Sequence, residues 1–120
     1  MIGVHFDAVR IEGDRGRAVA WRLIDAADGD AGPIVYEVTG NRWLYFLVPP
    51  GSVQRHEWPL GVHRFGMTNI RTVTFVGIPA LEGNTWPLRW WSNPTRESPY
   101  VDAELLLDSI TASPAPVRTR

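Results

Sequence analysis

Two pairs of polar side chains have types and spacings that support chemistry. His5 and Asp7 stand two residues apart in a segment that alternates like a strand, so their side chains share one face. A histidine beside a carboxylate can bind a metal ion or position a proton. His56 and His63 lie seven residues apart, whereas a zinc site needs about four convergent ligands. We keep these four residues as secondary candidates, and we expect a solvated, ion-paired strand edge as the commoner role of His5 and Asp7.

Tryptophan is the residue type in this chain that is best suited to binding. The 120 residues include six tryptophans. Trp90 and Trp91 are adjacent in an expected strand, so their indoles must point to opposite faces of a sheet. A tryptophan outside a core favours stacking on a base, a sugar, an arginine or a protein partner. The alternative is that a covering helix or loop buries both indoles.

Arginine stands beside tryptophan twice, at Arg42 and at Arg89. A guanidinium group can bind a phosphate or a carboxylate through two hydrogen bonds, and a neighbouring indole offers a flat face on which a ligand can stack. Strand alternation places neighbouring residues on opposite faces, so a shared site would have to form across strands. The candidate binding residues are Arg42, Trp43, Tyr45, Arg89, Trp90 and Trp91.

Several catalytic signatures are missing from the sequence. There is no phosphate loop, no dinucleotide-binding glycine pattern after a strand and no nucleophile elbow. The chain also has no cysteine, which removes disulfides, thiol nucleophiles, iron–sulfur clusters and cysteine zinc sites. We therefore expect no catalytic residue, no metal ion and no cofactor.

Hydrophobic periodicity and turn residues predict the elements that position these candidates. We expect strands at 4–11, 34–38, 42–48, 61–65, 72–78 and 88–91, and helices at 16–27 and 102–110. Asp14 and Asp102 are the expected helix caps, and Thr39-Gly40-Asn41 the expected hairpin turn. One helical turn is expected between Ser52 and Pro59.

These elements predict the fold class and the domain organisation. The order β-α-β-β-β-β-β-α indicates an α+β domain, with a mainly antiparallel sheet of five to six strands and two helices on one face. Five consecutive apolar residues, 44–48, predict a central strand that is covered on both faces. We expect a single domain over residues 1–111 and a proline-rich, flexible tail over 112–120.

Charge and composition predict where in the cell the protein acts. The net charge is −1, although all twelve basic residues are arginine, so no global basic field attracts nucleic acid. The first residues lack the basic and apolar segments of a signal peptide, and no apolar run approaches the ~20 residues that span a bilayer. We expect a cytoplasmic protein without membrane contact.

Four short blocks carry a family resemblance, namely residues 32–35, 45–51, 75–79 and 88–90. Their order resembles small uncharacterised proteins of high-GC filamentous bacteria and, more distantly, the bifunctional DNA primase/polymerase domain of that lineage. The match spans about residues 32–92, with Phe6-Asp7-Ala8-Val9-Arg10 near the start. That resemblance implies two metal-binding aspartates and a nucleotide-contacting histidine after a glycine turn. This chain has one such aspartate, Asp7, and Arg42 and Trp43 follow its turn, so the resemblance implies a degenerate relative without two-metal catalysis.

The sequence leaves three functions open. The leading hypothesis is a non-catalytic binding or regulatory module that acts through a protein partner or as a homo-oligomer. The second is a nucleic-acid or nucleotide binder that retains a primase-like groove and uses Arg42, Arg89 and an exposed tryptophan. The third is a small hydrolase or lyase that uses His5 and Asp7.

Overall fold

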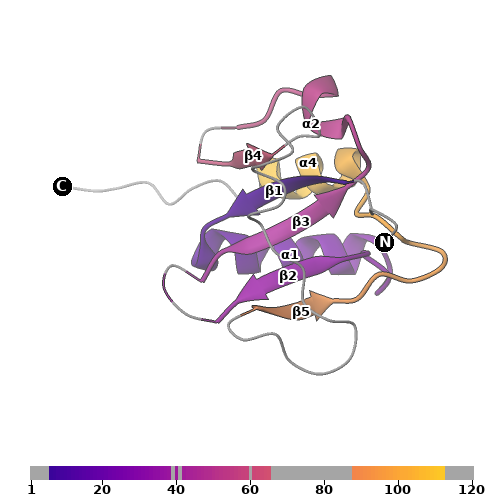
Figure 1. Ribbon diagram of the computed structural model, residues 1–120, viewed down its shortest axis with the longest axis horizontal. Coiled ribbons are helices and arrows are strands. Elements are labelled where there is room, and N and C mark those ends of the chain that lie inside the picture. The colour runs from indigo at the N-terminus through magenta and orange to yellow at the C-terminus, as the bar shows by residue number, and fades with distance from the viewer. Residues whose placement is uncertain (1–5, 39, 41, 60, 66–87, 113–120) are drawn as a thin grey trace, which may run out of the picture.

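The computed structural model describes residues 6–38, 40, 42–59, 61–65 and 88–112. The strands are β1 (Asp7–Ile11), β2 (Ile34–Glu37), β3 (Leu44–Val48), β4 (His63–Phe65) and β5 (Leu88–Ser92). The helices are α1 (Gly13–Ala26), α2 (Ser52–Arg55) and α4 (Ala103–Ala112). The strands form one antiparallel sheet in the order β4-β1-β3-β2-β5 (Figure 1). The α+β prediction is confirmed, while the strand expected at 72–78 lies outside the described residues.

Strand β3 occupies the centre of the sheet, as its unbroken apolar run predicts. It pairs with β1 on one side and with β2 on the other. All five of its side chains are buried. Fully burying one large apolar side chain contributes about 1.5–3 kcal/mol, so β3 is a major source of the free energy that holds the sheet together.

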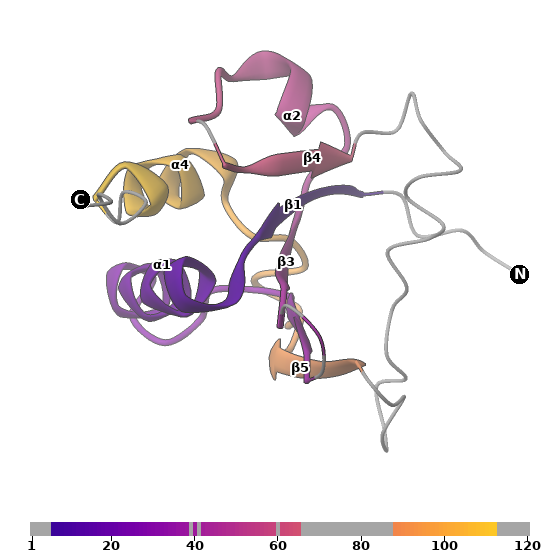
Figure 2. The same cartoon turned by 90° about the vertical axis from the view of Figure 1, so that its left-hand side faces the viewer.

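The two longer helices cover one face of the sheet (Figure 2). Gly16 allows α1 to lie close to that face, because a Cβ atom at this position would stand 2.9 Å from the carbonyl oxygen of Ile11 and 3.2 Å from Cδ1 of Leu44. The core between helices and sheet is built largely from the following residues: Val9, Ile11, Val19, Ala20, Leu23, Ile34, Leu44, Phe46, Val48, Leu106 and Ile110.

The opposite face of the sheet carries a second, smaller apolar cluster. Its buried members are Phe6, Ala8, Val35, Tyr45 and Leu47. Partly buried aromatic side chains pack against this cluster: Trp43, Trp90 and Tyr100. The sheet is therefore buried on both faces along β3, with β1 and β2 contributing to both clusters.

Local backbone chemistry explains where the elements begin. Asp102 caps α4, since its Oδ1 accepts the amides of Glu104 at 3.0 Å and Leu105 at 3.1 Å. The cap predicted at Asp14 is wrong: α1 begins at Gly13, and the Asp14 side chain instead pairs with Arg17 at 2.6 Å. The predicted start of a strand at residue 42 is also wrong.

Strand β3 begins two residues later than predicted, because the backbone before it is left-handed. Gly40 and Arg42 both have positive φ angles, of 64° and 55°. Such angles belong to turns rather than to strands, so β3 begins at Leu44. The predicted turn around Gly40 agrees with its angle, whereas Thr39 and Asn41 lie outside the described residues.

The expected helical turn after Ser52 and the expected tail are each described in part. The single helical turn expected after Ser52 is α2. Ala112, the first residue of the expected tail, is the last residue of α4, and the rest of that segment lies outside the described residues. Within the described ranges, no helix has the length and apolarity that crossing a membrane requires.

Candidate functional site

Trp90 and Trp91 point to opposite faces of β5, as strand alternation predicts. Trp90 packs against the smaller apolar cluster, and Trp91 packs against the core beneath the helices. Both side chains are half-buried. Each indole therefore belongs to a different layer of the molecule, and the two do not form one continuous binding surface.

Trp91 is the middle member of an aromatic row formed by Tyr36, Trp91 and Trp21. Its ring centroid lies 5.3 Å from that of Tyr36, with an angle of 69° between the ring planes. The centroid of Trp21 lies 6.0 Å away at 72°. These edge-to-face arrangements are favourable because the positive edge of one ring meets the negative face of the next. The row runs from β2 across β5 to the outer surface of α1.

Trp21 is the exposed end of this aromatic row. It is 62% exposed, and it is the one large hydrophobic side chain that is exposed among the described residues. Contact with Trp91 restricts its indole on one side, and the remainder is open to solvent. A large apolar surface that is held in place and accessible is a typical anchor for a protein partner.

Trp43, the residue before β3, stacks with one side chain from β1 and one from β4. The guanidinium carbon of Arg10 lies 4.1 Å from the centroid of Trp43, and the His63 ring meets the same indole edge-on at 5.3 Å. Nη2 of Arg10 lies 3.3 Å from Nδ1 of His63. Because arginine can only donate, Nδ1 of His63 accepts this hydrogen bond. The stack therefore connects β1, β4 and the residue that precedes β3.

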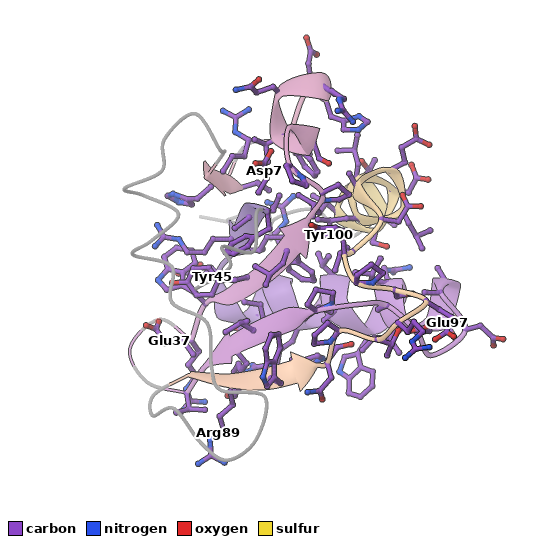
Figure 3. The ribbon with its side chains drawn as sticks, turned by 45° about the vertical axis from the view of Figure 1, so that its right-hand side comes forward. Asp7, Glu37, Tyr45, Arg89, Glu97 and Tyr100 are labelled. Atoms are coloured by element: carbon purple, nitrogen blue, oxygen red, sulfur yellow. The ribbon has the colours of Figure 1, made fainter. Side chains whose placement is uncertain are left out.

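Arg42 and Arg89 are brought to the same end of the sheet. Arg89 pairs with Tyr36 in the ladder between β2 and β5, while the amide of Glu37 donates to the carbonyl of Trp43 at 2.9 Å. Figure 3 shows Arg89 and Glu37 at this end. Both arginine side chains are exposed. Tyr45, in contrast, is 7% exposed inside the smaller cluster, so its ring does not face solvent.

The solvated edge that we expected at Asp7 is wrong. Asp7 is fully buried, and its Oδ2 accepts the amide of Val53 at 3.1 Å (Figure 3). This contact ties β1 to the first turn of α2, which follows Gly51 in its left-handed conformation. His5, the expected partner of Asp7, lies outside the described residues. Asp7 therefore has a structural role in joining β1 to α2.

His56 directly follows α2, at the rim of a shallow hollow of about 530 Å³ between α2 and the start of α4. Its ring packs edge-on against Trp58 at 5.9 Å. Arg55 and His56 line one side of the hollow, and the other side carries three acidic residues, Glu97, Asp102 and Glu104. In the part of the chain that the structure describes, no three histidine or acidic side chains are grouped to hold a metal ion.

Comparison with known proteins finds no relative of this chain. No family model matches it, and neither does any curated protein or solved structure. The resemblance to primase/polymerase domains therefore stays a prediction based on short strand segments.

Tyr36, Trp21 and Arg10 belong to the aromatic row and the stack but were not among the sequence candidates. Trp21 could have been found from the sequence. At 100° per residue, it lies ~140° around α1 from the centre of the apolar stripe that includes Val19 and Leu23. Its neighbours on that side of the helix are charged. Arg10 could not, since its contacts with Trp43 and His63 depend on strand register. The structure thus shows an aromatic row that is exposed at Trp21, a partly exposed stack around Trp43, and the buried carboxyl group of Asp7.

Proposed function

We propose that this protein is a non-catalytic binding module that acts through a protein partner or through self-association. The binding surface is the exposed face of α1 around Trp21, with the rest of the aromatic row behind it. The observation that carries the proposal is the 62% exposure of Trp21 together with its edge-to-face contact with Trp91.

The aromatic row also explains why this surface favours binding. Immobilising a flexible side chain at an interface costs about 0.5–1.5 kcal/mol. Contact with Trp91 already limits the motion of Trp21, so less of that cost remains when a partner binds. Burying the exposed part of an indole then contributes apolar area that few other residues supply.

A crosslinking experiment tests this proposal. Asp25 is exposed and lies one helical turn after Trp21, so a photoreactive amino acid at position 25 would label whatever covers the indole. We expect a defined protein adduct that disappears when Trp21→Ala is added. A photoreactive residue at the exposed Glu57 serves as the control. An adduct that persists without Trp21, or one equally strong from position 57, would contradict the proposal.

Nucleic-acid binding is the second candidate function, supported by the exposed Arg42 and Arg89 at one end of the sheet. Phosphate contacts release counterions, so binding would weaken steeply as salt increases. The test is fluorescence anisotropy of a labelled single-stranded oligonucleotide at low and moderate salt, with Arg42→Ala and Arg89→Ala for comparison. Salt-sensitive binding that both variants weaken would replace the protein-binding proposal, whereas no binding at low salt would remove this candidate.

We do not carry forward the hydrolase or lyase that uses His5 and Asp7. The full burial of Asp7 separates its carboxyl group from solvent and from a substrate. Turnover of any substrate that Asp7→Ala abolishes, in a variant that remains folded, would overturn the non-catalytic proposal.

A further inference from the structure

We infer that the partner of this surface is a second copy of the chain, paired antiparallel through α1 about a two-fold axis at Ala18. This inference rests on the proposed function, because it names the occupant of the same surface. It is carried by one row of side chains on the exposed face of α1, in which Asp14 and Arg22 lie on either side of Ala18 and carry opposite charges.

Three exposed residues define the contact. Asp14, Ala18 and Arg22 follow one another at four-residue spacing, so they form one row along the outer face of α1. The buried residues of the helix, Val19 and Leu23 among them, face the sheet instead. The row therefore presents a negative charge, a small side chain and a positive charge in that order.

An antiparallel pair of such rows is complementary. At a rise of about 1.5 Å per residue, Asp14 and Arg22 each lie about 6 Å along the helix from Ala18. A two-fold axis at Ala18 therefore brings Asp14 of one copy level with Arg22 of the other, twice. The small Ala18 at the crossing point allows the two helices to approach closely. A parallel pair in register would place like charges together, which costs free energy.

The side chains beside the row are compatible with this pairing. Asp14 already pairs with Arg17 through Oδ1 at 2.6 Å, but a carboxylate can accept several hydrogen bonds on its two oxygens. Trp21 precedes Arg22 and flanks the row, so the same contact that joins the helices also covers part of its exposed indole. The contact thus covers part of the one large hydrophobic side chain that is exposed among the described residues.

The size of the helix predicts a weak dimer. A helix of 14 residues is about 21 Å long, and one pair of such helices buries less area than the ~1,200–2,000 Å² of a stable interface. We therefore expect a weak, reversible dimer rather than an obligate one.

Charge exchange tests the inference by sedimentation equilibrium of the purified protein over a range of concentrations. In Asp14→Arg the row carries two positive charges, and in Arg22→Asp it carries two negative charges. Either variant therefore places like charges across the two-fold axis, and each is expected to weaken self-association at least tenfold. An equimolar mixture of the two variants places opposite charges across the axis again. The mixture, and the double variant D14R/R22D, are expected to associate with the affinity of the original protein.

A charge change on another helix serves as the control. Asp108→Arg changes the charge by the same amount on the exposed side of α4 and should leave association unchanged. Circular dichroism of each variant checks folding. If a single variant fails to fold, Trp21→Ala is the replacement, and its expected effect is a loss of about tenfold in association. A dimer that the charge variants leave intact, or a mixture that does not regain association, overturns the inference.

The two proposals fail in different ways. If the purified protein is monomeric at every concentration while position 25 still forms a Trp21-dependent adduct with another protein, the second copy is excluded and the binding module stands. If neither association nor an adduct is found, both proposals are overturned.

Discussion

The carboxyl group of Asp7 lies where water does not reach it, and it accepts the amide of a residue 46 positions later in the chain. That amide belongs to the first turn of α2, which is too short to be stable by its own hydrogen bonds. Asp7 therefore contributes to stability by holding this turn against β1. In the sequence, Asp7 resembles a reactive carboxyl group. In the structure, this residue of β1 caps the first turn of α2.

Replacement of Asp7 should lower stability without changing binding. Asp7→Ala leaves the buried amide of Val53 without its acceptor, so we expect a loss of about 1–3 kcal/mol in the free energy of unfolding. Asp7→Asn retains a carbonyl oxygen of similar position and should lose less. Urea denaturation followed by circular dichroism measures both. Equal stabilities of Asp7→Ala and the unchanged protein would show that this contact does not hold α2.

At this scale, the sequence predicts residue types better than it predicts roles. Alternation alone placed Trp90 and Trp91 on opposite faces, because side-chain direction in a strand follows from the backbone. The roles of Asp7, Tyr45 and Trp43 depend instead on which strands become neighbours. Register brings Arg10 and His63 to Trp43, and no local pattern contains that information.

Among the elements, α1 packs on the sheet through a position that has no side chain, Gly16. A methyl group at Gly16 would meet the carbonyl oxygen of Ile11 at 2.9 Å, a distance that requires the helix to move. The helix then loses contact with Leu44 in the central strand. The absence of a side chain at this position is therefore what lets α1 pack on the sheet.

Gly16→Ala should destabilise the protein although alanine favours helices. The gain in helix propensity is about 1 kcal/mol, whereas forcing extra volume into a packed contact costs about 1–3 kcal/mol. We expect a net decrease in the melting temperature, measured by differential scanning calorimetry. Ala18→Gly, at an exposed position in the middle of the same helix, isolates the propensity effect. An increase in melting temperature for Gly16→Ala would show that α1 can shift at no cost.

Element boundaries show which local signals are reliable. Asp102 was identified correctly because its side chain caps the helix that immediately follows it. Asp14 carries the same signal but lies inside the first turn, since α1 starts after Glu12 with no side-chain cap. A capping residue thus marks a helix start only to within a turn.

At the scale of the whole molecule, the sheet has a stable centre and weaker edges. Strand β3 is bonded on both sides, whereas β4 and β5 each pair with one described strand, β1 and β2 respectively. Opening of a central strand requires most of the molecule to unfold, while an edge opens locally. The fold class was predictable because the apolar run of β3 identifies this centre directly.

Amide hydrogen exchange should reveal this gradient. We expect amides of β3 to exchange at least a hundredfold more slowly than those of β4, because their opening approaches the global free energy of unfolding. Exchange measured by nuclear magnetic resonance resolves individual residues. Equal protection in β3 and β4 would indicate that the described sheet opens as one unit.

The position of β1 also has a consequence for synthesis. This strand lies between β4 and β3, and Val9 pairs with Phe46 and with Arg64, both much later in the chain. At roughly 5–20 residues per second, Phe46 is added about 2–7 s after Val9. During that interval β1 has neither of its neighbours, although it carries apolar side chains for both faces of the sheet. The nascent chain thus carries an incomplete apolar strand until its middle third has been translated, and a chaperone that binds extended apolar segments would meet this protein there first.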